Sequence, residues 1–132
     1  MSEKLDVVGI GNAMVDAIIP SNQNEIEKHD INRDSMNLID ENLKNNLHEK
    51  YSIKEMAGGG SLGNSMFGIT SFGGNGSFIG KIKNDEIGIY LQKNMMREGL
   101  KFPLGFTSPD ISTGCCTIFV EEDGTRTMCT FL

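Results

Sequence analysis

Asn12 and Asp16 form the first pair of side chains suited to hold a small polar ligand. They lie in the segment GIGNAMVD, at the end of the apolar run LDVVGI, which predicts a buried strand over residues 5–10. In open α/β sheets, ligands bind at the carboxyl ends of the strands. A carboxylate accepts charge-assisted hydrogen bonds, and an amide both donates and accepts. The competing interpretation is structural, with Asn12 shaping a turn and Asp16 a solvated strand residue.

The same segment partly matches the dinucleotide-binding fingerprint G-x-G-x-x-G. Gly9 and Gly11 occupy its first two glycine positions, but Met14 stands at the third. The fingerprint must also open a helix, whereas the residues from Val15 to Pro20 resume an extended pattern. These two differences disfavour a dinucleotide site here.

A second glycine-rich segment, GGGSLGNS at residues 58–65, matches the phosphate-binding pattern G-x-x-x-x-G-K-[ST] except that Asn64 replaces the lysine. A degenerate P-loop stays open as a weaker alternative, because no aspartate-ended apolar strand follows to hold magnesium. Gly59 and Gly60 still allow a ligand to approach the backbone at a helix N-terminus. Asn64 can both donate and accept, as a polyol requires. The structural alternative is a flexible loop with Asn64 near a helix cap.

The elements that must position these residues alternate between strand and helix, which predicts an α/β fold with a largely parallel sheet. The hairpin turn Glu122–Gly124 and the strand SMNLI break the alternation, so we expect a small extra sheet or an antiparallel edge. Apolar patterns predict strands over residues 5–10, 14–20, 35–39, 53–56, 77–82, 114–120 and 125–132. Amphipathic patterns predict helices over 22–29, 40–51, 61–72 and 85–99, with N-caps at Ser21, Asp40, Ser61 and Asp85.

The charge and composition of the chain disfavour some classes of binding partner. The 132 residues include 12 basic and 18 acidic side chains, for a net charge of -6. This balance disfavours nonspecific binding to nucleic acid or to an anionic membrane. No apolar run reaches the ~18 residues of a membrane span, and no signal peptide is evident. Cys115, Cys116 and Cys129 are odd in number and lack zinc-site spacing, which predicts reduced thiols in a cytoplasmic protein.

Four segments, in order, resemble the N-terminal half of a PfkB, or ribokinase-like, carbohydrate kinase. Two are the glycine-rich segments above, the second of which is similar to the family's G-G-x-x-x-N signature. FIGKI followed by NDEIG is similar to the family's IGKVGDDEFG, and Thr113-Gly114 followed by EDGTRTM is similar to TG…DGERTM. The adenosine-kinase-like branch is the most similar. The four segments span residues 11–16, 59–64, 78–88 and 113–128.

The resemblance implies a ribokinase-like, Rossmann-type sandwich with a small β lid, of which residues 1–132 are the N-terminal part of a single kinase domain. Such kinases transfer the γ-phosphate of ATP, with Mg²⁺, to a hydroxymethyl group of a sugar or nucleoside. SMNLI and the C-terminal hairpin are expected to contribute to the lid. This part of the domain is expected to bind the acceptor, through residues that the resemblance identifies as Asn12, Asp16, Gly59, Gly60 and Asn64.

Arg126 is a further candidate. In some relatives an arginine near this place reaches toward the phosphates, and a guanidinium group binds phosphate well. The ordinary alternative is a solvated surface charge on the hairpin.

The family's C-terminal G-A-G-D signature, which supplies the catalytic aspartate and the anion hole, is absent from these residues. We therefore assign no catalytic residue and no metal ligand here, and expect the nucleotide site mostly outside this chain. The chain alone is expected to lack kinase activity and to aggregate or form a homodimer, because an interrupted parallel sheet leaves an apolar edge. A noncatalytic module that binds a sugar or nucleoside is the alternative function.

Overall fold

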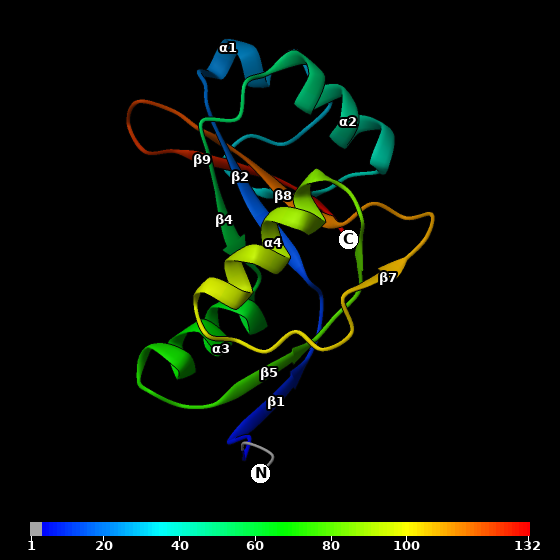
Figure 1. Cartoon of the computed structure of the whole chain (residues 1–132). Helices are drawn as coiled ribbons and strands as arrows, with labels where there is room; N and C mark the ends of the chain where they lie inside the picture. The colour runs from blue at the N-terminus through cyan, green and yellow to red at the C-terminus, as the bar shows by residue number, and fades with distance from the viewer. Residues whose placement is uncertain (1–3) are drawn as a thin grey trace. The chain divides into compact units, whose positions relative to one another are not determined.

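The computed structural model describes residues 4–132, which form two compact units connected by three strands (Figure 1). Unit 1 contains the chain up to Val15 together with Ala57–Gly114. Unit 2 contains Asp16–Met56 and Cys115–Leu132. The boundaries fall inside strands and not in loops, so each unit is built from separate stretches of sequence. Among the described residues, no helix is long and apolar enough to cross a bilayer.

Unit 1 is built on short parallel strand pairs and two helices. β1 pairs with β5 in the register Val7↔Gly76 to Ile10↔Ile79, and β6 pairs with β7. Helix α4 buries Ile87, Leu91 and Met95, as its period predicts. The elements of unit 1 are β1 (Val7–Ile10), α3 (Ser61–Ser71), β5 (Gly76–Ile79), β6 (Ile82–Lys83), α4 (Glu86–Arg97) and β7 (Phe106–Ser108).

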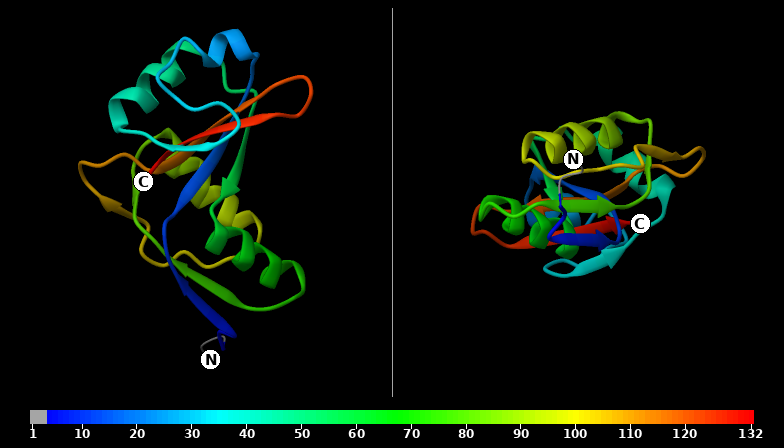
Figure 2. Two further views of the ribbon diagram at one scale, coloured as in Figure 1. Left: turned by 180° about the vertical axis from the view of Figure 1, so that it is seen from behind. Right: turned by 60° about the horizontal axis from the view of Figure 1, so that its bottom comes forward.

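Unit 2 is organised on a five-stranded sheet with the order β3-β9-β8-β2-β4. β3 runs parallel to β9, whereas β8 and β9 form the antiparallel hairpin coloured orange to red in Figure 2. The elements that lie wholly or partly in unit 2 are β2 (Met14–Pro20), α1 (Gln23–Ile26), β3 (Met36–Leu38), α2 (Glu41–Lys50), β4 (Glu55–Gly59), β8 (Gly114–Val120) and β9 (Arg126–Phe131). The expected antiparallel element is therefore present.

The core of unit 2 lies on one face of this sheet. Ile19, Phe119 and Cys129 point to that face from three strands and are buried there. Ile26 of α1 and Leu47 of α2 pack against them. Because side chains alternate along a strand, the neighbours of these strand residues lie on the opposite face, away from both helices.

Local chemistry accounts for several predicted boundaries. The Asp40 carboxylate accepts the Leu43 N–H at 2.8 Å and begins α2, and Asp85 begins α4 through the Gly88 N–H at 2.7 Å. Gly99, with φ of 77°, follows the end of α4 as expected. The turn of the β8–β9 hairpin also lies where it was predicted, since the Gly124 N–H donates to the Glu121 carbonyl.

Other boundaries were predicted wrongly. The N-cap of α1 is Asn22 and not Ser21, because the Asn22 side chain accepts the Glu25 N–H. Helix α1 is also shorter than predicted. The residues 77–82, predicted as one strand, divide into β5 and β6 around Gly80. A Cβ at Gly80 would lie 2.6 Å from Phe78 and 2.9 Å from Ala13, so the chain bends there at a close approach that only glycine permits.

Candidate functional site

The glycine-rich segment turns directly from strand β4 into helix α3. Gly60, and not Ser61 as predicted, is the N-cap residue of α3, and no side chain caps the helix. Gly60 has φ of 80° and ψ of 148°, a conformation restricted to glycine. A Cβ there would also lie 3.0 Å from Met14 Cγ. Gly59 is buried as the last residue of β4.

The end of β1 meets the start of α3 within unit 1. A Cβ at Gly11 would lie 2.7 Å from Leu62, and a Cβ at Gly60 would lie 3.6 Å from the carbonyl oxygen of Asn12. The Asn12 backbone and the glycine turn are therefore adjacent. The structure thus brings together two of the five predicted acceptor-binding residues that are far apart in the sequence.

Hydrogen-bonding groups are free around this turn. Asn12 and Asn64 are exposed, and neither side chain bonds to another described residue. The backbone N–H of Asn64 is used within the helix, donating to Gly60. The first N–H groups of α3 have no partner inside the helix, and the partial positive charge of the helix N-terminus favours oxygen ligands there. The arrangement suits a polar ligand rich in oxygen.

Asp16 is the third residue of β2 and belongs to unit 2. It is half-buried, and burial raises the pKa of its carboxyl above the ordinary value. Its side chain forms no ion pair or hydrogen bond with another described residue. A carboxylate that is partly desolvated and unpaired is destabilised, and it gains from any hydroxyl donor that reaches it.

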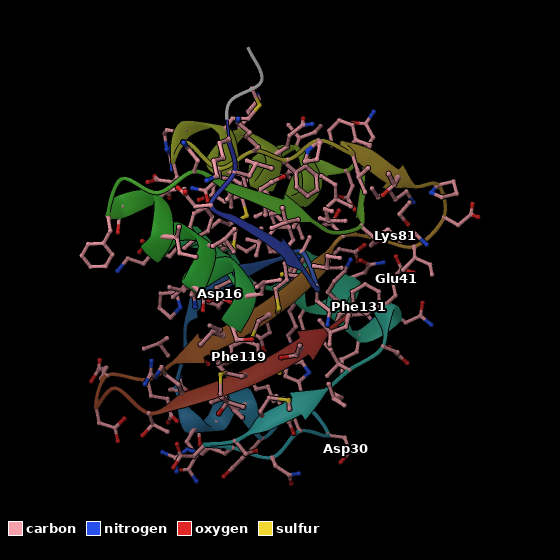
Figure 3. The ribbon with its side chains drawn as sticks, turned by 90° about the horizontal axis from the view of Figure 1, so that it is seen from below. Asp16, Asp30, Glu41, Lys81, Phe119 and Phe131 are labelled. Atoms are coloured by element: carbon pink, nitrogen blue, oxygen red, sulfur yellow. The ribbon has the colours of Figure 1, made fainter. Side chains whose placement is uncertain are left out.

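Asp16 lies on the face of the unit 2 sheet opposite the helix-covered core. Figure 3 labels Asp16 together with Phe119, whose ring belongs to the core on the other face. Strand alternation and the pairing of β3, β8 and β9 place mostly apolar or sulfur-containing side chains on the Asp16 face. They are Ile18, Met36, Leu38, Cys116, Ile118 and Met128.

Arg126 begins β9 opposite Val120 and is exposed. Its guanidinium group bonds to no other described residue. Alternation along β9 places it on the same face as Met128. Its position is compatible both with the predicted phosphate contact and with a surface charge.

The third motif segment and Thr113 have a structural role that the sequence did not reveal. Asp85, besides capping α4, accepts hydrogen bonds from the backbone and hydroxyl of Thr113. The Thr113 hydroxyl also accepts the Lys83 N–H at 3.0 Å. A Cβ at Gly88 would lie 2.0 Å from the Lys83 carbonyl oxygen. These residues hold β6, α4 and the start of β8 together within unit 1.

The cysteines are free and buried, as expected. Burial, with a smaller contribution from Cys116, raises the pKa of the Cys115 thiol to about 12, so the thiol stays protonated at neutral pH. His48 Nε2 lies 2.8 Å from the Thr117 hydroxyl and 4.0 Å from Cys115 Sγ. In the part of the chain that the structure describes, no three His, Cys, Asp or Glu side chains gather to hold a metal ion.

Sequence reasoning assigned no contact to Met14, whose side chain approaches Gly60. The sequence feature that could have indicated this contact is the position of Met14 in GIGNAMVD, where a dinucleotide fingerprint has its third glycine.

The predicted residues are divided between the units: Asn12, Gly59, Gly60 and Asn64 belong to unit 1, and Asp16 and Arg126 to unit 2. A single pocket shared by Asp16 and Asn64 stays a prediction.

The dinucleotide and P-loop alternatives fit this geometry poorly. After Gly11 the chain enters β2 and not a helix, although a dinucleotide fingerprint needs strand, turn and helix in that order. The strand before the second glycine segment, β4, lies at the edge of its sheet and not at the centre.

Comparison with known proteins identifies the class. A family model described as pfkB family carbohydrate kinase matches residues 5–132, and the chain belongs to this family. None of the curated proteins compared with the chain matches it.

Solved structures give the same fold. An adenosine kinase from Sinorhizobium meliloti is 34% identical over 98% of this chain, with a TM-score of 0.83. A probable sugar kinase from Rhizobium etli CFN 42 is 31% identical over 97% of this chain, also with a TM-score of 0.83. An adenosine kinase from Anopheles gambiae is 25% identical over 95% of this chain, with a TM-score of 0.79. The expected ribokinase-like α/β fold is confirmed.

The match accounts for only part of these relatives. The aligned region covers 40% of the Sinorhizobium meliloti chain, 39% of the Rhizobium etli chain and 38% of the Anopheles gambiae chain. The 132 residues therefore correspond to less than half of each relative.

Proposed function

We propose that this chain forms the acceptor-binding part of an ATP-dependent kinase that phosphorylates a hydroxymethyl group of a sugar or nucleoside. The observation that carries the proposal is the juxtaposition of Asn12 with the uncapped glycine turn at Gly60. It occurs in a member of the PfkB carbohydrate kinase family whose solved relatives include adenosine kinases and a probable sugar kinase.

In unit 1, the acceptor is held by amides and backbone. Asn12 and Asn64 offer free donors and acceptors to neighbouring hydroxyls. Gly59 and Gly60 allow the ligand to lie against the backbone, where a side chain would block the approach. Each such bond orients the acceptor, and orientation lowers the barrier to a group transfer.

In unit 2, the Asp16 carboxylate accepts a hydrogen bond from an acceptor hydroxyl. Burial that raises its pKa also strengthens that bond, because the surroundings compete less than water does. The resemblance implies that SMNLI and the C-terminal hairpin contribute to a lid, and a lid excludes water from the transferred group. Arg126, on the same face as Met128, would contact phosphate through its guanidinium group.

ATP would supply the phosphoryl group, and Mg²⁺ would accompany it. No metal ligand is assigned among the described residues, and no step through Mg²⁺ is assigned to this chain. Its own residues bind and orient the acceptor. A cytoplasmic location and a homodimer stay predictions from the sequence.

Calorimetric titration of the 132-residue chain with adenosine, ribose and fructose tests the proposal. At least one of these polyhydroxyl ligands should bind, and Asp16→Ala should weaken that binding about tenfold to a hundredfold through loss of a charged acceptor. Glu122→Ala removes an exposed hairpin carboxylate and is the matched control. Binding of none of the three ligands, or equal weakening by both substitutions, contradicts the proposal.

A noncatalytic module that binds a sugar or nucleoside through the same residues is the second candidate. The two functions differ in turnover and not in binding. The chain should consume no ATP alone under either function. A longer polypeptide that contains these residues should phosphorylate the bound acceptor if the kinase proposal holds, and should only bind it if the module is the whole function.

A further inference from the structure

Asn94 interrupts the apolar face of helix α4. The buried side chains of this helix include Ile87, Leu91 and Met95, and the helical period places position 94 on the same face. An apolar residue is expected there, but the sequence has an amide that is only 9% exposed. The Asn94 side chain forms no hydrogen bond with another described residue. A buried amide without a partner is unfavourable and calls for an explanation.

The Asn94 amide lies against strand β4, at the start of the second glycine-rich segment. A Cβ at Gly58 would lie 2.7 Å from Asn94 Oδ1 and 2.6 Å from the ring of Phe67. Gly58 is therefore enclosed between side chains of α4 and α3, all within unit 1. Two residues later the chain turns at Gly60, where β4 passes directly into α3 (Figure 1).

The space beside Gly58 suits an oxygen atom. Gly58 has a hydrogen in the direction of the missing Cβ, and Asn94 Oδ1 lies on that side. Carbonyl oxygens make close contacts with Cα–H groups, whereas a methyl group is larger and would press on β4. An apolar side chain at position 94 would remove the unfavourable burial of an amide but would displace the strand.

We propose that Asn94 is a positioning residue for the acceptor: through its contact with Gly58, it fixes the glycine turn at Gly59 and Gly60 against which the acceptor lies. This inference rests on the proposed function of that turn. Asn94 acts through Gly58 and not by touching the acceptor, because its amide lies on the side of β4 that Phe67 also covers. Local departures from favourable packing concentrate at functional sites.

The alternative is that Asn94 only fills space between α4 and β4. The two roles differ in the property that they affect. Removal of a space-filling side chain alters stability and changes binding only as far as the fold is weakened. Removal of a positioning side chain weakens binding even where stability is retained.

Asn94→Ala separates these roles. It removes the buried amide, and alanine favours a helix more than asparagine does, so the melting temperature should be unchanged or higher. Calorimetric titration with adenosine, ribose and fructose should show binding weakened about tenfold for each ligand that the unsubstituted chain binds, because the turn is no longer fixed. Asn45→Ala is the matched control, since Asn45 is exposed in α2 and undergoes the same change in helix propensity. It should leave binding unchanged.

Two further measurements test the contact itself. The Asn64 N–H donates to the Gly60 carbonyl at 3.0 Å, so its hydrogen exchange reports on the turn without a ligand. That exchange should be about tenfold faster in Asn94→Ala than in Asn45→Ala. Gly58→Ala should also weaken binding about tenfold, because its Cβ displaces the strand. Addition of Asn94→Ala to Gly58→Ala should weaken binding no further, since both substitutions act on one contact.

The proposal is overturned if Asn94→Ala leaves either binding or the exchange of Asn64 unchanged, or if binding weakens only together with a fall in melting temperature. It is also overturned if the effects of Gly58→Ala and Asn94→Ala on binding add. Faster exchange in Asn94→Ala, with no ligand bound by the unsubstituted chain, supports the action of Asn94 on the turn and contradicts the proposed function.

Discussion

The Asp85 carboxylate holds Thr113 with both oxygens: Oδ2 accepts the Thr113 backbone N–H at 2.9 Å, and Oδ1 accepts its hydroxyl at 2.8 Å. The same Oδ1 accepts the Gly88 N–H at 2.7 Å. Thr113 immediately precedes β8, which leads into unit 2. One carboxylate therefore fixes both the start of helix α4 and the point from which the chain leaves unit 1.

Removal of either partner should destabilise unit 1. Asp85→Ala is expected to lower the free energy of unfolding by about 1–3 kcal/mol, through loss of the cap and of bonds to partly buried groups. Thr113→Val keeps the shape and should cost about 1 kcal/mol. Because the two residues share these bonds, the double variant should cost less than the sum of the single ones. Urea denaturation measures all three.

The control for this cycle is Glu86→Ala, which removes the exposed carboxylate next to Asp85. It should change stability by only a few tenths of a kcal/mol, roughly the effect of an acidic residue in a first helical turn. Additive effects of Asp85→Ala and Thr113→Val would show that the two residues act independently.

Gly60 and Gly63 should respond in opposite directions to alanine. At Gly60 the positive φ and the 3.0 Å approach to Met14 make a Cβ unfavourable, so Gly60→Ala should cost about 1–3 kcal/mol. At Gly63, inside α3, a Cβ meets nothing within 4 Å. Gly63→Ala should therefore stabilise the helix by about 0.5–1 kcal/mol. Thermal unfolding compares the two variants, and destabilisation by both would contradict the free space at Gly63.

Asp16→Asn should stabilise the chain near neutral pH by up to about 1 kcal/mol. Burial raises the folded pKa of Asp16, so the folded state retains the proton at a pH where the unfolded state has lost it. The contribution of this group to stability is present below its ordinary pKa and is lost as pH rises through the folded pKa. The amide introduced by Asp16→Asn does not ionise, so the variant does not lose this stability as pH rises. Melting temperatures between pH 3 and 7 measure it.

Asp123→Asn, the matched substitution, should have the opposite effect on the stability of the chain. The Asp123 carboxylate accepts the Thr125 N–H at 2.9 Å, and this bond lowers its pKa. Charge at Asp123 therefore favours the folded state, and Asp123→Asn should slightly destabilise the hairpin. A lower melting temperature for Asp16→Asn at pH 7 would show that its carboxylate has a stabilising partner.

Above pH 9 the cysteines should make stability fall. Burial raises the pKa of Cys115 from 9.0 to about 12 and that of Cys129 to about 11. Between the ordinary pKa of 9.0 and the raised pKa of each folded cysteine, the thiol ionises in the unfolded state but not in the folded one. The free energy of unfolding therefore falls by at most about 1.4 kcal/mol per pH unit for each thiol. Denaturation at pH 8.5, 9.5 and 10.5 should show this slope.

Cys115→Ala should reduce the slope. Thr117→Val, a substitution in the same strand that removes no thiol, should leave the slope unchanged even where it lowers stability overall. An identical slope for the unsubstituted chain and Cys115→Ala would show that this thiol ionises as easily in the folded state as in the unfolded one.

The sequence predicted features whose chemistry is local. Asp40 and Asp85 cap helices within three residues of themselves, and the turn before Thr125 closes within a few residues, so spacing alone located them. The boundary at Gly60 was missed because backbone conformation, and not side-chain type, selects the cap there.

Contacts distant in sequence could not be predicted from spacing. Asp85 and Thr113 are 28 positions apart, and no periodicity connects them. The bend at Gly80 depends on the approach of Ala13 from another strand. In the candidate site, the adjacency of Asn12 and Gly60 agrees with the family resemblance, whereas the contribution of Asp16 stays a prediction.

The pairing of β1 with β5 also affects how the protein is made. Val7 leaves the ribosome long before its register partner Gly76, because all of unit 2 except its C-terminal hairpin is translated between them. At about 5–20 residues per second, this interval lasts several seconds. During it the nascent chain displays the unpaired segment Val7–Ile10, an extended apolar sequence of the kind that holdase chaperones protect from aggregation.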